Sequence, residues 1–209
     1  MACLMLTMSA AAAFSTILIN GQVLALLARA RAGTIHKERL EQADSVATLL
    51  ALFSVLIAVG AAITFCAWLH RVLTNLAALG APEKRYSPGY AVWAFFIPVV
   101  NLVVPVRALR DAWGAADVPR FLRIWWFTWI ACNLLAWTSA ALGFRGDYEN
   151  GLAIGIAGDA VTIVAAGLAI RVIRRFTRRA DDLDAIQGAS RPGTHDRGAG
   201  HPAVAANAP

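Results

Sequence analysis

The sequence predicts an all-α protein, a polytopic bundle of transmembrane helices. Of its 209 residues, 58% are hydrophobic and only 15% are charged, whereas soluble domains carry about 25% charged residues. The mean hydropathy is +0.58. The apolar residues gather in stretches of about the 20 residues that a helix needs to cross the hydrocarbon core of a bilayer. These observations exclude a water-soluble globular domain and predict a transmembrane domain over residues 1–179.

The first two spans are predicted at residues 2–28 and 45–69. The first stretch carries no charge, and no basic segment precedes it, as the apolar core of a cleaved signal peptide would require. We therefore expect it to remain as a span. A polar loop separates it from the second span, for which Asp44 or Ser45 is a candidate N-cap.

Two further spans are predicted at residues 121–144 and 151–170. In the last one, Gly151, Gly155 and Gly158 form a small-residue face, which permits close packing on another helix of the bundle or, less commonly, in a homo-oligomer. From residue 180 the composition shifts to small and polar residues, which predicts a disordered tail over 180–209.

The segment at 87–106 is apolar but is interrupted by Pro88, Pro98, Asn101 and Pro105. Proline removes a helical hydrogen bond, which disfavours a straight helix. The stretch from Pro88 to Pro98 would be about 16 Å long, roughly half the hydrocarbon thickness. This predicts a re-entrant or interfacial segment that turns at Pro98–Asn101, where the Asn amide satisfies exposed backbone, and leaves along an amphipathic piece.

Charge identifies the side of the membrane on which the chain ends. The net charge is +6, and the excess lies beside the apolar stretches, which is not the pattern of a nucleic-acid-binding protein. Five arginines follow Ile170 within nine residues: Arg171, Arg174, Arg175, Arg178 and Arg179. Such clusters stop a span on the cytoplasmic side and attract anionic lipid headgroups. We therefore expect a cytoplasmic C-terminal tail and an anionic lipid partner.

The positive-inside rule does not choose between four spans and five, because both place most basic residues on the side of the tail. The uncharged N-terminus favours five spans, whereas the proline-broken segment favours four. We favour four. The 43 alanines, and 17 arginines among 19 basic residues, are typical of a GC-rich bacterial genome, so we expect a bacterial cytoplasmic membrane.

A set of ordered residues resembles the signature of the bacterial membrane proteins classified as domain of unknown function 4328. These residues are Trp68, Arg71, Asn75, Gly80, Ser87, Pro88, Gly89, Pro98, Asn101, Pro105, Arg110 and Trp113. The resemblance implies a multi-span protein and no assigned activity, and it makes these residues candidates for function. We find no catalytic motif, and the three cysteines show no metal-binding spacing. We therefore expect no enzyme activity, cofactor or metal.

Asp159 is the first candidate outside this set, because a carboxylate in the middle of a span costs about 2.5 kcal/mol or more. It either takes part in transport or proton relay or locks the bundle through hydrogen bonds to Asn133 or Asn101. The second role is the commoner one. Arg71 and Asn75, four residues apart, could bind an anionic headgroup, although a span-terminal arginine commonly snorkels without a ligand.

Two functions follow from these features. The first is a structural or interaction component of the cytoplasmic membrane, whose basic tail meets lipid or an unidentified partner. The second is a small transporter or channel-like protein with a midplane site near Asp159 and the Pro98–Asn101 break, as in transporters with broken helices. The small size and the lack of an internal repeat favour the first.

Overall fold

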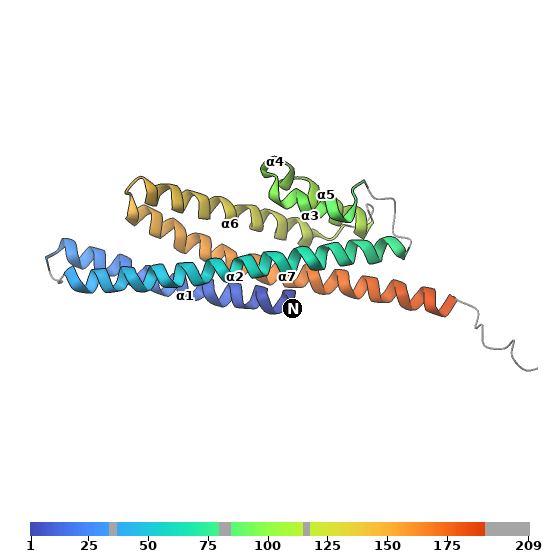
Figure 1. The fold of residues 1–209 in the computed structure, drawn as a ribbon, viewed down its shortest axis with the longest axis horizontal. Coiled ribbons are helices and arrows are strands. Elements are labelled where there is room, and N and C mark those ends of the chain that lie inside the picture. The colour runs from blue at the N-terminus through green and yellow to red at the C-terminus, as the bar shows by residue number, and fades with distance from the viewer. Residues whose placement is uncertain (34–36, 80–84, 115–117, 191–209) are drawn as a thin grey trace, which may run out of the picture.

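The computed structural model describes residues 1–33, 37–79, 85–114 and 118–190, and within these ranges it is helical without strands (Figure 1). The elements are α1 (Ala2–Arg31), α2 (Lys37–Ala78), α3 (Pro88–Trp93), the 3-10 helix η1 (Ala94–Phe96), α4 (Pro98–Asn101), α5 (Val104–Trp113), α6 (Arg120–Phe144) and α7 (Tyr148–Ser190). The prediction of an all-α helical bundle is confirmed.

Four of these helices are long and apolar enough to cross a membrane: α1, α2 from Ser45 onward, α6 and α7. They coincide with the four uninterrupted apolar stretches of the sequence. The helices of the segment at 88–113 are three to ten residues long, too short to span. The chain therefore has the composition and the architecture of a multi-span membrane protein.

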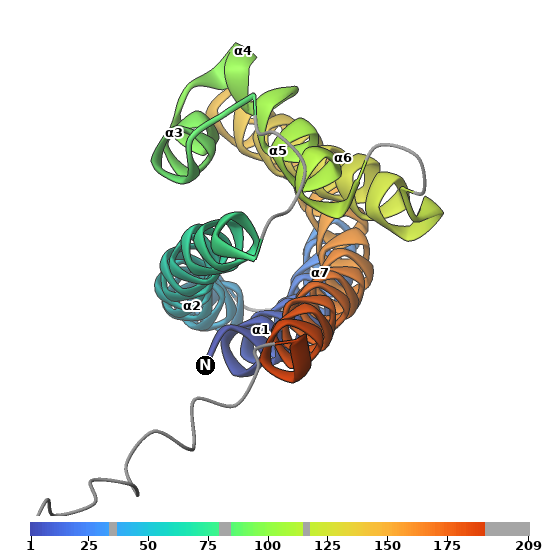
Figure 2. The same ribbon diagram turned by 90° about the vertical axis from the view of Figure 1, so that its right-hand side faces the viewer.

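The four long helices form an open arc in the order α2, α1, α7, α6 (Figure 2). The arc is open between α2 and α6 (Figure 2). The short helices α3 to α5 lie in this opening and contact both long helices. We call residues 88–113 the hairpin, because α2 ends and α6 begins at the same end of the molecule (Figure 1). That end, which includes the basic part of α7, is called the arginine end, and the opposite one the loop end.

The buried core lies at the arginine end, where the hairpin meets the long helices. Its fully buried large side chains are Leu69, Leu76, Pro105, Leu109, Leu122, Val172 and Phe176. Elsewhere large apolar side chains point outward: Trp137 is 76% exposed and Phe144 is 93% exposed. Exposed apolar surface on this scale is expected of helices whose outer faces contact lipid.

Glycines hold α6 and α7 together toward the loop end. A Cβ atom at Gly155 would lie 3.1 Å from Ser139 Oγ, and one at Gly158 would lie 3.2 Å from Leu135 Cβ. Ser139 Oγ also donates a hydrogen bond of 2.7 Å to the carbonyl oxygen of Gly151. The small-residue face predicted for the last span is therefore confirmed as the surface that packs against another helix.

Two predicted boundaries were wrong. Helix α2 begins at Lys37, so neither Asp44 nor Ser45 caps it; the good helix formers before Asp44 extend it beyond the apolar stretch. Helix α7 continues to Ser190, so the tail is helical rather than disordered over 180–190. Leu183 explains this, because it packs against the core and so continues the apolar face of the helix. The remainder of the predicted tail, 191–209, lies outside the described residues.

Candidate functional site

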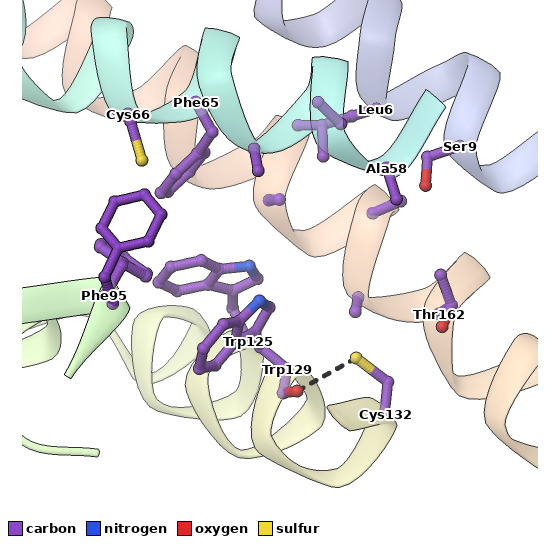
Figure 3. A pocket seen from close by; sticks show the side chains of 16 residues that line it. Leu6, Ser9, Ala58, Phe65, Cys66, Phe95, Trp125, Trp129, Cys132 and Thr162 are labelled. Atoms are coloured by element: carbon purple, nitrogen blue, oxygen red, sulfur yellow. Dashed lines mark hydrogen bonds between the residues drawn. The ribbon is translucent and has the colours of Figure 1, made fainter. Parts of the chain in front are cut away.

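An apolar cavity of about 290 Å³ lies between the four long helices and η1 (Figure 3). No charged side chain lines it. Two of its polar groups bond to their own helices: Thr162 Oγ1 donates to the carbonyl oxygen of Gly158 at 2.9 Å, and Cys132 Sγ donates to that of Trp129 at 3.0 Å. The lining therefore offers van der Waals contact to an apolar group.

Aromatic rings close one side of this cavity (Figure 3). The ring of Phe95, on η1, lies 5.9 Å from that of Phe65 and 5.8 Å from that of Trp129, and Phe65 lies 5.6 Å from Trp125. These centroid distances are typical of favourable aromatic pairs. Through Phe95, the hairpin fills the space between α2 and α6 at the arginine end.

Prolines determine where the hairpin turns. Ser87 caps α3 by accepting a hydrogen bond of 3.2 Å from the backbone N–H of Tyr90, and Pro88 occupies the first turn of that helix. Pro98 and Pro105 likewise stand in the first turns of α4 and α5. Proline is tolerated at these positions because their N–H groups have no intrahelical partner. The chain thus breaks near Pro98, as the sequence predicts.

The break is held by a residue that the sequence did not single out for this role. Trp126 Nε1, from α6, donates a hydrogen bond of 3.2 Å to the carbonyl oxygen of Leu102. The Asn101 amide was predicted to satisfy exposed backbone, and this was wrong: its Oδ1 is buried without a hydrogen-bond partner among the described residues. The indole suits the role because it combines apolar bulk with one donor.

Asp159 is half-buried on α7, one turn from Thr162 of the cavity, and no described residue forms a hydrogen bond or ion pair with it. The expected bond to Asn133 does not form, because Asn133 Nδ2 donates to the carbonyl oxygen of Trp129 at 2.8 Å instead.

Asp159 lies at a different depth from the hairpin tip, which is the turn around Leu102 that Trp126 binds. Gly158 packs on Leu135, which is nine residues, or about 13 Å, along α6 from the Trp126 that binds the tip.

The residues that carry the resemblance to the family signature are called the motif residues. Those on α2 divide into two groups. Trp68 packs inward: its Nε1 donates to Thr177 Oγ1 at 3.4 Å, and its ring lies edge-on to Phe176. Arg71 and Asn75 are exposed. Among the other motif residues, Gly89 has open space around its Cα, and Gly80 lies outside the described residues.

Trp113 joins the hairpin to α7. Its ring lies 4.9 Å from that of Phe176, and the guanidinium group of Arg179 lies 4.8 Å from the ring centroid. A cation over an aromatic face within about 6 Å is attracted by the ring. Arg179 was predicted to contact lipid with its neighbours, but it is half-buried and turns toward the protein.

The other four arginines of the cluster form the α7 arginine stripe: Arg171, Arg174, Arg175 and Arg178. Their spacing places them on one face of α7, where they line a shallow cavity of about 270 Å³ and are exposed. Arg171 is anchored over the ring of Phe121 at 5.6 Å. No described carboxylate lies within 4 Å of these guanidinium groups, so none of the four arginines forms an ion pair with a described residue.

A second basic cavity, of about 280 Å³, lies on the hairpin and is called the hairpin arginine pocket. Its lining residues are Arg85, Arg107, Arg110 and Asp111. Arg110, a motif residue, is thus brought beside Arg85 and Arg107, whereas Trp113 of the same helix packs inward. The arrangement therefore presents positive charge at the same end of the molecule as the α7 arginine stripe.

The sequence model of a protein family described as Domain of unknown function (DUF4328) matches residues 31–178. The chain belongs to this family. The matched region contains the hairpin, Asp159 and the whole α7 arginine stripe. No curated protein and no solved structure is significantly similar to the chain.

Proposed function

We propose that this member of the family is a structural or interaction component of the bacterial cytoplasmic membrane that binds anionic lipid headgroups through its arginine end. The α7 arginine stripe carries the proposal, because it follows the apolar part of α7 directly and has no described acidic partner. A basic residue near an anionic leaflet contributes about 1 kcal/mol of attraction. Four on one helix face hold that end of α7 at the headgroups.

The hairpin supports the same orientation. Its tip exposes Trp93, Phe96 and Val99 by 68%, 66% and 78%, and such a patch on a membrane protein is suited to lipid. We infer that the tip enters the cytoplasmic leaflet without crossing the bilayer. The protein then has four spans, with both ends of the hairpin and the C-terminal tail in the cytoplasm.

Thermal unfolding of the purified protein in a neutral detergent tests the lipid interaction. Phosphatidylglycerol is expected to raise Tm more than phosphatidylcholine, because a ligand that binds the folded state stabilises it. Added salt should reduce the difference. Arg174→Gln/Arg175→Gln should lose most of it, whereas Arg145→Gln, an exposed arginine at the loop end, should keep it. Equal responses of both variants would contradict the proposal.

Thiol labelling tests the topology. In a variant with Cys3, Cys66 and Cys132 changed to Ser, single cysteines are placed at Ala78 and Arg120, the ends of α2 and α6 that flank the hairpin. Both should label only after the cells are permeabilised, and Asp147→Cys at the loop end should label from outside. Labelling of Ala78→Cys and Arg120→Cys from opposite sides would mean that the hairpin crosses the membrane.

A transporter is the second candidate function. The observation that favours it is the Asp159 carboxylate, which has no partner among the described residues and lies one turn from the apolar cavity. Its site would not include the Pro98–Asn101 break, which lies about 13 Å away along α6. Asp159→Asn distinguishes the two functions. Under our proposal it leaves Tm and the lipid response unchanged; loss of a proton- or ion-dependent flux at a normal protein level would favour transport.

A further inference from the structure

The hairpin arginine pocket has the chemistry of a binding site for one phosphate group. Arg85 precedes α3, and Arg107 and Arg110 lie three residues apart on α5. No described carboxylate lies within 4 Å of any of these guanidinium groups, that of Asp111 included. Guanidinium groups form paired, charge-assisted hydrogen bonds with phosphate oxygens. Three of them around a cavity of about 280 Å³ are therefore suited to a phosphate ester.

The depth of the pocket relative to the hairpin tip makes a membrane lipid the source of that phosphate. Helix α5 buries Pro105 and Leu109 against the bundle and exposes Arg107 and Arg110 on its other side. Arg110 lies six residues after Val104, where α5 starts at the apolar tip, or about 9 Å along the helix. With the tip in hydrocarbon, the guanidinium groups reach the level of the lipid phosphates.

Asp111 adds a second requirement for the bound headgroup, namely a hydrogen-bond donor. A carboxylate repels phosphate, but it accepts hydrogen bonds, and Asp111 Oδ2 is buried without a hydrogen-bond partner among the described residues. A buried acceptor without a donor destabilises the folded state. A headgroup that carries a donor next to its phosphate would therefore be favoured there. Because three arginines face one aspartate, the net positive charge favours a headgroup that is itself negative.

We propose that the hairpin arginine pocket binds the headgroup of a single anionic phosphodiester lipid with hydroxyl donors, such as phosphatidylglycerol. Arg85, Arg107 and Arg110 bind the phosphate, and the glycerol hydroxyls donate to the Asp111 carboxylate. This inference rests on the proposed function, since it places the arginine end at the headgroups. It adds a defined site with a stoichiometry of one lipid and a chemical preference, whereas the α7 arginine stripe attracts negative charge without choosing among headgroups.

Native mass spectrometry of the full-length protein in mild detergent tests the site. The protein is mixed with equal amounts of phosphatidylglycerol and phosphatidylmethanol with the same acyl chains. One phosphatidylglycerol should be retained in preference to phosphatidylmethanol, a phosphodiester of the same charge that has no headgroup hydroxyl. Arg107→Gln/Arg110→Gln should lower the retained fraction at least tenfold. Arg107→Lys/Arg110→Lys, which keeps the charge but not the paired hydrogen bonds, should also lower it.

The α7 variant Arg174→Gln/Arg175→Gln is the matched control. It should keep the retained lipid although it loses most of the lipid-dependent rise in Tm, and the part of the rise that remains comes from the lipid in the pocket. If the hairpin variants retain the lipid as the unmodified protein does, the pocket inference is overturned while the proposed function stands on the Tm result. If only the Tm result fails, the proposed function loses its main support and the retained lipid still identifies a site.

Asp111→Asn tests the requirement for a donor. It removes a negative charge, so attraction alone would increase retention of both lipids in proportion. Donor recognition instead predicts that the preference for phosphatidylglycerol over phosphatidylmethanol falls, and an unchanged ratio would overturn this part of the inference. Equal retention of phosphatidylethanolamine would contradict the preference for net negative charge. Displacement of the lipid by an equal concentration of soluble glycerol phosphate would contradict a lipid source.

Discussion

The two ends of the molecule are stabilised in different ways. At the arginine end, Leu122 and Phe176 are fully buried in a core that also contains Trp125 and Trp126, much as in a water-soluble domain. Toward the loop end, α6 and α7 meet through glycines, and Trp137 and Phe144 point outward. In lipid no hydrophobic force drives helices together, so close packing of small residues replaces burial. The chain thus combines two kinds of helix packing.

The largest effect is expected when the core of the arginine end is truncated. Phe176→Ala should destabilise the protein by about 3–5 kcal/mol, because it removes a fully buried ring that contacts Trp68 and Trp113. Phe144→Ala, at a side chain that is 93% exposed, should change stability little. Unfolding in detergent measures both. Equal losses would mean that the two ends are stabilised alike.

Overpacking of the glycine contact should have the next largest effect. A Cβ at Gly151 would lie 3.2 Å from the carbonyl oxygen of Ser139 and 3.4 Å from the backbone nitrogen of Gly143. Since backbone cannot move aside as a side chain can, Gly151→Val should cost about 1–3 kcal/mol. Gly167→Val is the control, because no atom lies within 4 Å of its Cβ position. A neutral Gly151→Val would show that α6 and α7 are not in close contact.

Removal of the hydrogen bond to the hairpin should have a smaller and more local effect. Trp126→Phe keeps a ring but deletes the donor to Leu102, which should cost about 1 kcal/mol. Amide hydrogen exchange should become faster in residues 98–113 and stay unchanged in α1. Trp137→Phe serves as the control. Unaltered exchange in the hairpin would show that the aromatic contacts of Phe95 hold it without this bond.

The smallest effect is expected at the ion pair of the loop end. Arg31 Nη1 lies 2.8 Å from Glu149 Oε2, but these side chains are 73% and 37% exposed. Exposed pairs contribute about 0.2–1 kcal/mol. A double-mutant cycle with Arg31→Gln and Glu149→Gln should give a coupling in this range that declines with added salt. A coupling above about 2 kcal/mol, beyond the range of exposed pairs, would place the pair among the main supports of that end.

Much of the fold could be predicted because apolar length and proline position are local properties. The four apolar stretches became the four long helices, and the prolines marked the starts of α3, α4 and α5. The helix ends were harder to predict. The composition of residues 180–190 is mostly small and polar, which is typical of a disordered tail. Only the tertiary contact of Leu183 shows why these residues remain helical.

The candidate site was predictable in composition but not in geometry. The motif identified Arg110 and the cluster after Ile170 identified the α7 arginines, yet neither indicated that Arg85 and Arg107 would join Arg110 around Asp111. Arg179 differs from its neighbours for a similar reason, because its contact with Trp113 depends on where the hairpin lies. Pairings between residues far apart in sequence follow from the tertiary arrangement, which no local pattern contains.

Helix α7 has one more consequence, which follows from its length. Its 43 residues extend for about 64 Å, twice the hydrocarbon thickness, from the loop end to Ser190 (Figure 1). It packs on α6 and α1 over its first part and on Trp113 of the hairpin further along. Because this helix is continuous, it joins the two ends of the molecule directly, and any change in its tilt at the loop end would displace Ser190 sideways.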